Sequence, residues 1–266
     1  MIPKIIHYCW FGRNPLPPLA LKCIESWKKF FPDYEIKEWN EDNFDVDIIP
    51  YTHEAYEAKK YAFVSDYARF YILYHYGGLY FDTDVEVIKP MDDIIERGAF
   101  MGCENEAKPG ATALAVAPGL GLGCNPGLGL GCNPGLGLGC NPGLGLGCNP
   151  GLSLYAEILQ LYAELHFLRM NGGLKTVVSY TTELLITKGL KNIDGIQHIA
   201  DIWIYPKDYF CPIDYNTKLC IITQNTRSIH HFAESWHGRK EKIYKILARI
   251  FGKAFIKYWL RILQKI

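Results

Sequence analysis

Residues 65–84, SDYARFYILYHYGGLYFDTD, decide the fold of this chain and its candidate site. The apolar and aromatic spacing predicts a helix over residues 61–76, and the pair Gly77-Gly78 is typical of a helix end. Residues 79–81 then form a short apolar run that predicts a buried strand, and an acidic turn follows it. The stretch therefore predicts a helix, a tight bend and a strand in one continuous unit.

Acidic side chains gather around this unit. Because side chains i and i+2 face the same way in an extended segment, Asp82 and Asp84 are expected to present two carboxylates at the carboxyl end of the strand, where α/β sheets bind ligands. Two convergent carboxylates suit Mg²⁺ or Mn²⁺ that bridges to phosphates. On the helix, Asp66 and Arg69 stand one turn apart, and Tyr80 lies on the strand. A polar turn and a structural ion pair are the alternatives to a site.

The segments outside this stretch predict an α/β fold. Residues 2–10 indicate a buried strand, an amphipathic helix starts after the prolines at 17–18, and residues 34–39 alternate like a strand, which together predict a parallel unit. Further on, residues 85–88, 199–205 and 229–232 are predicted extended. Residues 153–168 and 176–188 are predicted helical. Strands thus alternate with helices throughout the body.

Composition and charge exclude several classes of protein. The chain has 266 residues, of which 49% are apolar and 14% aromatic, so it can bury a large core and is not disordered. The 28 basic residues balance the 28 acidic ones, which argues against a nucleic-acid-binding protein. Residues 239–266 carry nine basic residues and one acidic residue, so the body is acidic and the tail is basic.

The sequence favours a cytoplasmic protein. The opening MIPKIIHYCWFG lacks the basic leader and long apolar stretch of a secretory signal, and no apolar run is long enough to cross a bilayer. Four of the nine cysteines belong to a repeat, and the five others are scattered. Reduced thiols fit this pattern better than a disulfide framework.

An octapeptide repeat interrupts the body. Residues 119–150 are four identical copies of GLGLGCNP. Eight residues are too few for a solenoid unit, and Asn-Pro-Gly is a turn signal. We expect a surface loop in which one copy is native and three are an expansion, because loop-closure entropy grows slowly with length. A metal site built from the cysteines or a phosphate cradle built from the glycines lacks the spacing and the partner residues that such sites need.

The tail has the pattern of a basic amphipathic helix. From residue 242 the basic residues recur every three or four positions, while aromatic and aliphatic residues occupy the other half of the helix. This pattern suits an anionic membrane surface at the inner face of the plasma membrane, and it equally suits packing on the body. We therefore predict two parts, a catalytic domain over residues 1–238, interrupted by a 119–150 loop, and a helix over 239–266.

The central motif also carries a family resemblance. The run SDYARFYILYHYGGLYFDTDVEVIKP, with the opening IPKIIHYCWFG and the late IHHFAESW, resembles glycosyltransferase family 32, whose members have a D-x-D sugar-binding region. That family includes bacterial capsular and lipopolysaccharide sugar transferases and yeast-type mannosyltransferases, and it is related to clostridial glucosylating toxins. The resemblance covers residues 1 to about 105 and then only 231–236. It implies a GT-A type fold with a mixed, mostly parallel sheet flanked by helices.

The resemblance also implies ligands and residue roles. The implied ligands are a nucleotide-diphosphate sugar donor, a saccharide acceptor and Mn²⁺ or Mg²⁺. Trp10 would stack on the nucleotide base, which its flat ring suits when it is exposed. Asp66 and Arg69 would hold the hydroxyls of the donor sugar, and Tyr80 would line the donor pocket.

The acidic pair and a late histidine complete the implied metal site. Asp82 and Asp84 would bind the ribose or sugar and the metal-diphosphate. His231 would be the third metal ligand, with His230 as the alternative. The implied catalytic residues are Asp84, Asp82 and Arg69.

The implied reaction follows from charge. Breaking the bond between sugar and diphosphate leaves extra negative charge on the phosphate, so a fixed cation there lowers the barrier. Ser235 with Trp236 would touch the departing phosphate. The resemblance implies retention of the anomeric configuration. Because no carboxylate can be nominated beneath the anomeric carbon, front-face attack is the working hypothesis.

The sequence thus predicts a retaining, metal-dependent hexosyltransferase that acts on a surface-polysaccharide or lipid-linked saccharide acceptor. One alternative is a phosphoryl-transfer enzyme, because Phe-Asp-x-Asp after a strand also occurs in aspartyl-phosphate phosphatases. Those enzymes usually have Thr or Val where Glu86 stands, and they carry the motif on the first strand. Another alternative is a non-catalytic binding module that uses the repeat.

Overall fold

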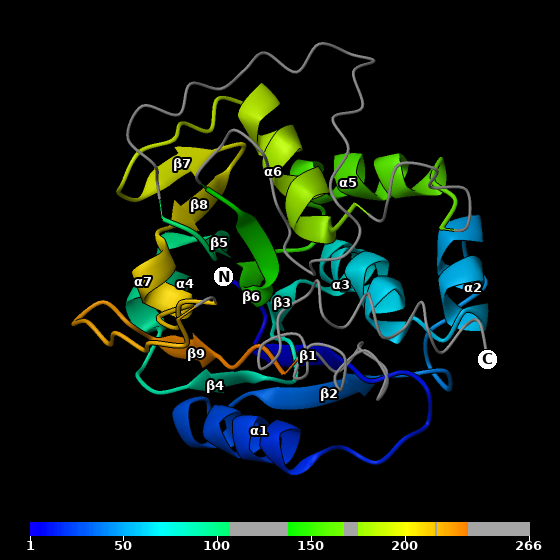
Figure 1. The fold of residues 1–266 in the computed structure, drawn as a ribbon, viewed down its shortest axis with the longest axis horizontal. Helices are drawn as coiled ribbons and strands as arrows, with labels where there is room; N and C mark the ends of the chain where they lie inside the picture. The colour runs from blue at the N-terminus through cyan, green and yellow to red at the C-terminus, as the bar shows by residue number, and fades with distance from the viewer. Residues whose placement is uncertain (107–137, 168–174, 216, 234–266) are drawn as a thin grey trace, which may run out of the picture. The chain divides into compact units, whose positions relative to one another are not determined.

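The predicted strand, helix and strand at the N-terminus form one side of a central sheet (Figure 1). The structure is a computed structural model that describes residues 1–106, 138–167, 175–215 and 217–233. β1 (Ile5–Cys9) pairs in parallel with β2 (Glu35–Trp39), and α1 (Pro18–Phe30) connects them. Proline suits the start of α1 because the first helical N–H groups have no partner within the helix. The apolar face of α1 is buried, and Trp27 near its end is fully buried.

Seven strands make up the sheet, in the order β2-β1-β3-β6-β5-β8-β7. The other five are β3 (Gly78–Tyr80), β5 (Phe100–Cys103), β6 (Cys140–Cys148), β7 (Gln197–Ile199) and β8 (Ile202–Tyr205). The pairings make β2, β1, β3, β5 and β8 run in one direction, and β6 and β7 run in the other. The predicted α/β class, with a mixed, mostly parallel sheet flanked by helices, is confirmed.

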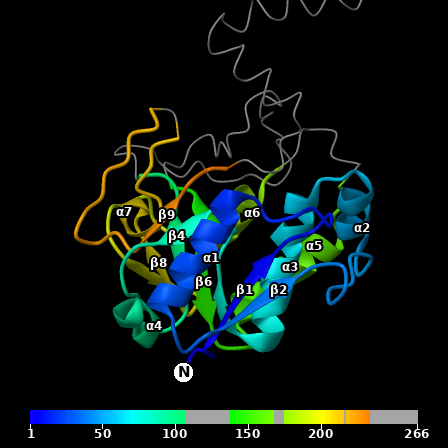
Figure 2. The same cartoon turned by 90° about the horizontal axis from the view of Figure 1, so that it is seen from below.

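Helices cover both faces of the sheet (Figures 1 and 2). One face carries α2 (Pro50–Glu57), α3 (Tyr61–Tyr76), α5 (Ser153–Ala163) and α6 (Val177–Thr187), and it holds the larger apolar core. The other face carries α1, α4 (Asp92–Arg97), α7 (Lys207–Phe210) and the antiparallel pair of β4 (Val85–Val87) and β9 (Ser228–His230). This layering buries a core on each side of the strands.

The helix α3 lies against the sheet with most of its length buried. Ten of its 16 residues are buried, which fits a helix that packs on several sides rather than one that shows a polar face to water. Gly77 ends the helix as predicted, with φ +64°. A side chain on Gly78 would begin 2.6 Å from the carbonyl oxygen of Ile5, so this position needs glycine for the close approach of β3 to β1.

The last part of the repeat forms a central strand, so the prediction of a surface loop is wrong for residues 140–148. All nine residues of β6 are buried between β3 and β5. Glycine is rare in strands, so the sequence of this segment does not predict one. In this structure the missing side chains leave room for large side chains of neighbouring strands. A side chain on Gly147 would begin 2.2 Å from the ring of Phe100. The copies before residue 138 lie outside the described residues.

The strand β6 takes residues from two copies of the octapeptide. Cys140 to Pro142 end the third copy, and the fourth copy begins at Gly143. Between β5 and β6 the register shifts, so that residues 142–145 have no partner in β5. This bulge is next to the acidic turn, as bulges often are at functional sites. The described helices include none long and apolar enough to cross a membrane, and the predicted helix at 239–266 lies outside the described residues.

Candidate active site

A buried arginine joins two carboxylates at the carboxyl edge of the sheet. Arg69 Nη2 lies 3.1 Å from Asp66 Oδ1 on the same helix and 3.3 Å from Asp82 Oδ1 after β3. The arginine side chain is 4% exposed, whereas that of Asp82 is 29% exposed. The cluster therefore has a buried end at Asp66 and an end at Asp82 that solvent or a ligand can reach.

Neighbouring groups fix the orientation of this arginine. Arg69 Nε donates a hydrogen bond to the backbone oxygen of Ser65, 3.0 Å away. The guanidinium carbon lies 5.2 Å from the ring centre of Tyr80, a cation–π distance. The hydroxyl of Tyr80 in turn donates to Asp82 Oδ1 at 3.1 Å. The helix and the strand thus bring Asp66, Arg69, Tyr80 and Asp82 together, as the sequence predicted.

Burial perturbs the charges of the cluster. Loss of water raises the pKa of the Asp66 carboxyl to about 7, although the adjacent Arg69 opposes this change. Burial alone would lower the pKa of Arg69, but Asp82, Tyr80 and Asp66 raise it, so the guanidinium stays charged. Such perturbed groups in one cluster are typical of functional sites.

The bulge of β6 positions the carboxylate of Asp82. The Asp82 backbone N–H donates to the oxygen of Gly143 at 3.1 Å. A side chain on Gly143 would begin 2.0 Å from Asp82 Oδ2. Only a glycine at position 143 therefore leaves room for the carboxylate in this position.

The two aspartates of the D-x-D motif contact different partners. Residues 82–85 form a turn closed by a hydrogen bond from the Val85 N–H to the Asp82 oxygen at 3.0 Å, so the extended pattern that predicted both carboxylates on one side does not apply. Asp82 contacts Arg69 and Tyr80. Asp84 Oδ1 lies 3.4 Å from His230 Nε2 in β9.

The late histidine beside Asp84 is His230, which corrects the prediction of His231. Side chains alternate along a strand, so adjacent histidines face opposite ways, and the sequence alone does not select between them. His231 Nε2 instead lies 2.8 Å from Glu86 Oε2, which also pairs with Lys22 at 2.8 Å.

The charged form of His230 is stabilised by its neighbour. Burial alone would lower the pKa of His230, but the Asp84 carboxylate raises it well above its usual range. Burial raises the pKa of Glu104, which lies near His230 and accepts a hydrogen bond from Asn141 Nδ2 at 2.8 Å. This side of the turn is therefore a second buried polar cluster.

The other predicted site residues have different outcomes. Trp10 follows β1 at the same edge of the sheet, is partly exposed, and donates from Nε1 to the oxygen of Asn14 at 2.6 Å. Its stacking on a nucleotide base stays a prediction. Ser235 and Trp236 lie outside the described residues.

Sequence reasoning missed the residues that support the acidic turn. Gly143, Asn141 and Glu104 were not predicted as part of the site, because the repeat was interpreted as a loop and 100–103 was not predicted as a strand. The Asn141 side chain also accepts a hydrogen bond from the N–H of Gly143 at 2.7 Å. No local signal singles them out, because the same Asn-Pro recurs in every copy of the repeat.

The carboxylates of the D-x-D motif are the predicted ligands of a divalent cation. Among residues 1–106, 138–167, 175–215 and 217–233, no group of three or more His, Cys, Asp or Glu side chains is placed to hold a metal ion. Mg²⁺ and Mn²⁺ in phosphate chemistry need only one or two carboxylates, because substrate oxygens and water supply the remaining ligands. Asp82 and Asp84 are the two carboxylates of the motif, but in this structure they contact different partners, so their joint binding of a cation stays a prediction.

Comparison with known proteins gives matches in the same region. Residues 17–101 match the family model described as a glycosyltransferase sugar-binding region containing a DXD motif. The chain is 31% identical over 111 residues to inositol phosphoceramide mannosyltransferase 1 of Schizosaccharomyces pombe, covering 38% of this chain and 33% of that protein. It is 32% identical over 104 residues to inositol phosphoceramide mannosyltransferase 3 of the same organism, covering 38% of this chain and 29% of that protein. The chain thus spans about a third of the length of these relatives.

A solved structure, the PaToxG glycosyltransferase, is also similar, with a TM-score of 0.44, 16% identity and coverage of 71% of this chain and 70% of that one. The family match carries the assignment, because it contains Asp66, Arg69, Tyr80, Asp82 and Asp84. Residues 17–101 therefore match the glycosyltransferase sugar-binding region with its DXD motif, and this match confirms the predicted resemblance to glycosyltransferase family 32.

Proposed function

We propose that this protein is a metal-dependent, retaining glycosyltransferase that transfers a hexose from a nucleotide-diphosphate sugar to a saccharide acceptor. The observation that carries the proposal is the bridge from Asp66 through Arg69 to Asp82 at the end of β3, inside the region that matches the sugar-binding family model. A phosphoryl-transfer role has no comparable support, because the acidic motif follows the third strand of the chain and not the first.

The two carboxylates of the motif would bind different parts of the donor. Asp82 is the exposed end of a hydrogen-bonded cluster, which suits the binding of sugar or ribose hydroxyls, since a carboxylate accepts two or more hydrogen bonds. Arg69 supplies guanidinium N–H donors from the same side. Trp10, at the end of the neighbouring strand β1, offers a partly exposed ring for the base.

The opposite part of the turn suits the diphosphate. Asp84, with Asp82, would hold a Mn²⁺ or Mg²⁺ ion, which when bound neutralises the diphosphate charge that grows as the sugar departs. His230, kept charged by Asp84, adds a fixed positive group at the same place. An anionic leaving group therefore meets a site whose side chains are already arranged for it.

We propose that the transfer is a front-face substitution at the anomeric carbon. An acceptor hydroxyl oxygen forms a bond to the anomeric carbon, the bond from that carbon to the diphosphate oxygen breaks, and the acceptor proton leaves with the nucleoside diphosphate. Both groups occupy the same face of the sugar, so the anomeric configuration is retained. Retention is proposed on the family resemblance, with no carboxylate nominated for a covalent intermediate.

The names of the relatives suggest a donor sugar for this protein, and they give less support to any particular acceptor. The names of the yeast proteins describe transfer of mannose to inositol phosphoceramide. We propose a mannose-type hexose as the first donor to try and a surface-polysaccharide or lipid-linked saccharide as acceptor. The tail at 242–266 would bring the protein to an anionic membrane surface, and unchanged vesicle binding after its deletion would contradict that part.

The test is hydrolysis and transfer with a panel of nucleotide sugars. We expect at least one donor, among the GDP- and UDP-hexoses, to be hydrolysed with Mn²⁺ and not with chelator. Proton NMR of the first-formed sugar should show the anomer of the donor. Absence of any metal-dependent turnover across the panel would contradict the proposal, and the opposite anomer would contradict retention.

A further inference from the structure

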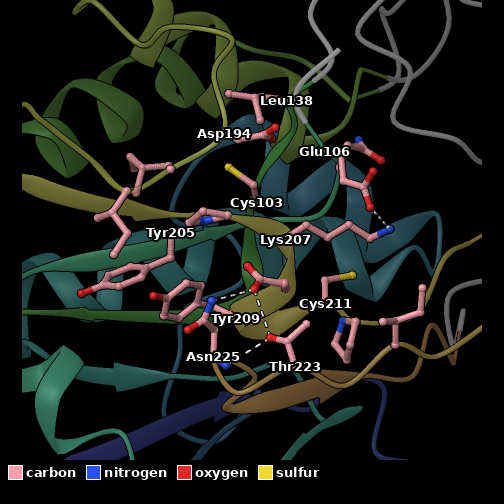
Figure 3. Close-up of a pocket in the computed structure, with 18 of the residues that line it drawn as sticks. Cys103, Glu106, Leu138, Asp194, Tyr205, Lys207, Tyr209, Cys211, Thr223 and Asn225 are labelled. Carbon is pink, nitrogen blue, oxygen red and sulfur yellow. Dashed lines mark hydrogen bonds and ion pairs between the residues drawn. The ribbon is translucent and has the colours of Figure 1, made fainter. Parts of the chain in front are cut away.

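A cavity of about 700 Å³ lies at the carboxyl ends of β5 and β8 (Figure 3). We propose that this cavity binds the acceptor, a neutral hydroxyl-rich sugar attached to an apolar group. Its volume is typical of small-molecule sites. The inference rests on the proposed glycosyltransferase function, but the binding site itself can be tested without a sugar donor.

The cavity lies at the same edge of the sheet as the D-x-D motif. β5 and β8 run in the direction of β1 and β3, so the carboxyl ends of all four strands meet one edge. Cys211 lines the cavity, and its thiol lies beside the imidazole of His230, which contacts Asp84. Cys211 and His230 thus connect the wall of the cavity to the motif.

The residues that line the cavity come after the region that matches the family model. The match stops at residue 101, and the first residue that lines the cavity is Cys103. The matched family region therefore gives no guide to the ligand of this cavity. Its own chemistry has to define the occupant.

One wall of the cavity is polar and aromatic, as Figure 3 shows. Asp208 accepts hydrogen bonds from Thr223 Oγ1 at 3.1 Å and from Asn225 Nδ2 at 3.0 Å. Tyr205 and Tyr209 lie with ring centres 4.9 Å apart. Amide and carboxylate groups pair with sugar hydroxyls, and aromatic rings pack against the C–H face of a sugar.

The charge of the lining favours a neutral ligand. Among the described residues that line the cavity, Lys207 is the one basic residue, and its Nζ lies 3.8 Å from carboxylates of both Glu106 and Asp214. Asp194 and Asp208 add further negative charge. A phosphorylated headgroup would meet net repulsion here, whereas a neutral sugar would not.

The rim of the cavity is apolar. Ile193, Leu219 and Ile221 line it although they are 50%, 59% and 60% exposed. Exposed large apolar side chains that line one cavity are typical of a surface that contacts a ligand. The rim therefore suits a hydrocarbon group carried by the sugar.

The first test compares methyl and octyl glycosides of mannose, glucose and galactose, titrated below the micelle concentration and followed by saturation-transfer NMR. We expect an octyl glycoside to bind about tenfold or more tightly than its methyl counterpart. Ile221→Asp should remove that advantage. Ile222→Asp is the matched control, because Ile222 is 56% exposed and does not line the cavity. Equal effects of both variants, or binding of no glycoside, would overturn the proposal.

The second test addresses the polar wall. Asn225→Ala should weaken both glycosides about tenfold, and the neighbouring Gln224→Ala, outside the lining, should not. A phosphorylated octyl glycoside that binds more tightly than the neutral one would also overturn the proposal.

Donor hydrolysis separates this site from the proposed function. Ile221→Asp should leave metal-dependent donor hydrolysis unchanged, and Asp82→Asn should abolish that hydrolysis while glycoside binding persists. Glycoside binding without any donor hydrolysis would leave the cavity assigned and contradict the proposed function alone.

Discussion

At the scale of single residues, Arg69 holds the candidate site together. It contacts both the buried Asp66 and the more exposed Asp82. A buried charge that loses its partner is costly, because water no longer compensates it. The stability of the cluster and its binding chemistry therefore depend on the same side chain.

Replacing Arg69 by Met should lower the free energy of unfolding by about 3 kcal/mol, because two carboxylates lose their shared cation. Urea unfolding at pH 7 measures this change in the free energy of unfolding. The double variant Asp66→Asn/Arg69→Met is the control and should recover part of the loss, since it also removes the buried acid. A single variant within about 0.5 kcal/mol of the wild type would contradict this account.

The raised pKa of Asp66 predicts a pH-dependent stability. The folded carboxyl releases its proton near pH 7, whereas the unfolded one releases it near its ordinary pKa of 3.8. The folded state binds more protons between these values, so this group's contribution to stability is full below about pH 4 and is lost as the pH rises through about 7.

Comparison with Asp66→Asn isolates that contribution. The variant lacks the titrating group, so the wild type should lose stability relative to it from pH 4 to pH 8, by at most about 4 kcal/mol. Chemical unfolding at several pH values gives the difference. Parallel stability curves for the two proteins would show that Asp66 does not titrate in this way.

At the scale of elements, the acidic turn depends on the shape of β6. The bulge brings Gly143 against Asp82, and the paired part of the strand brings Gly147 against Phe100. Neither position has room for a side chain, because Asp82 lies against Gly143 and Phe100 lies against Gly147. Their variants should therefore separate function from stability.

Gly143→Ala should displace the Asp82 carboxylate, because the added carbon would lie 2.0 Å from Oδ2. We expect donor hydrolysis to fall by about tenfold or more, which corresponds to one lost hydrogen bond or ion pair. Gly147→Ala is the control. It should lower the unfolding midpoint through Phe100 and leave the activity of the folded fraction intact. Equal activity losses per folded molecule would contradict the role of Gly143.

The repeat offers a second test of β6. The nine residues of the strand, CNPGLGLGC, occur at 124–132, 132–140 and 140–148. Deleting two octapeptides, 119–134, leaves this stretch whole and should leave the unfolding midpoint unchanged.

Deleting all three, 119–142, places Ala117 where Asn141 stands and removes its hydrogen bonds to Glu104 and Gly143. That longer deletion should cost about 1–3 kcal/mol, measured by urea unfolding. Equal stability of the two deletion proteins would contradict the position of Asn141 in the strand.

At the scale of the whole molecule, the sequence predicted what local patterns determine. The strand, helix and strand of 2–39 and the unit at 61–81 have strong periodicity and clear end signals, and the structure confirms them. Asp66, Arg69 and Asp82 could be placed together because one helix and one strand carry them. Short spacing within one unit makes such contacts predictable.

The remaining features depend on contacts between distant segments. Glycine in β6 is unfavourable locally and becomes favourable only beside Phe100 and Asp82. The choice of His230 over His231 depends on the register of β4 and β9, which no local pattern encodes. The cavity is lined by segments from residue 103 to residue 225, so only the assembled sheet creates it.

The central claim is that Asp84 takes part in metal-dependent turnover of a nucleotide sugar. The most direct measurement is Mn²⁺-dependent donor hydrolysis by the wild type, by Asp84→Asn and by Glu86→Gln, with the unfolding midpoint of each protein determined in parallel. We predict that Asp84→Asn loses activity by about a hundredfold or more while it remains folded, and that Glu86→Gln retains most activity. A folded Asp84→Asn protein with wild-type hydrolysis would contradict the claim.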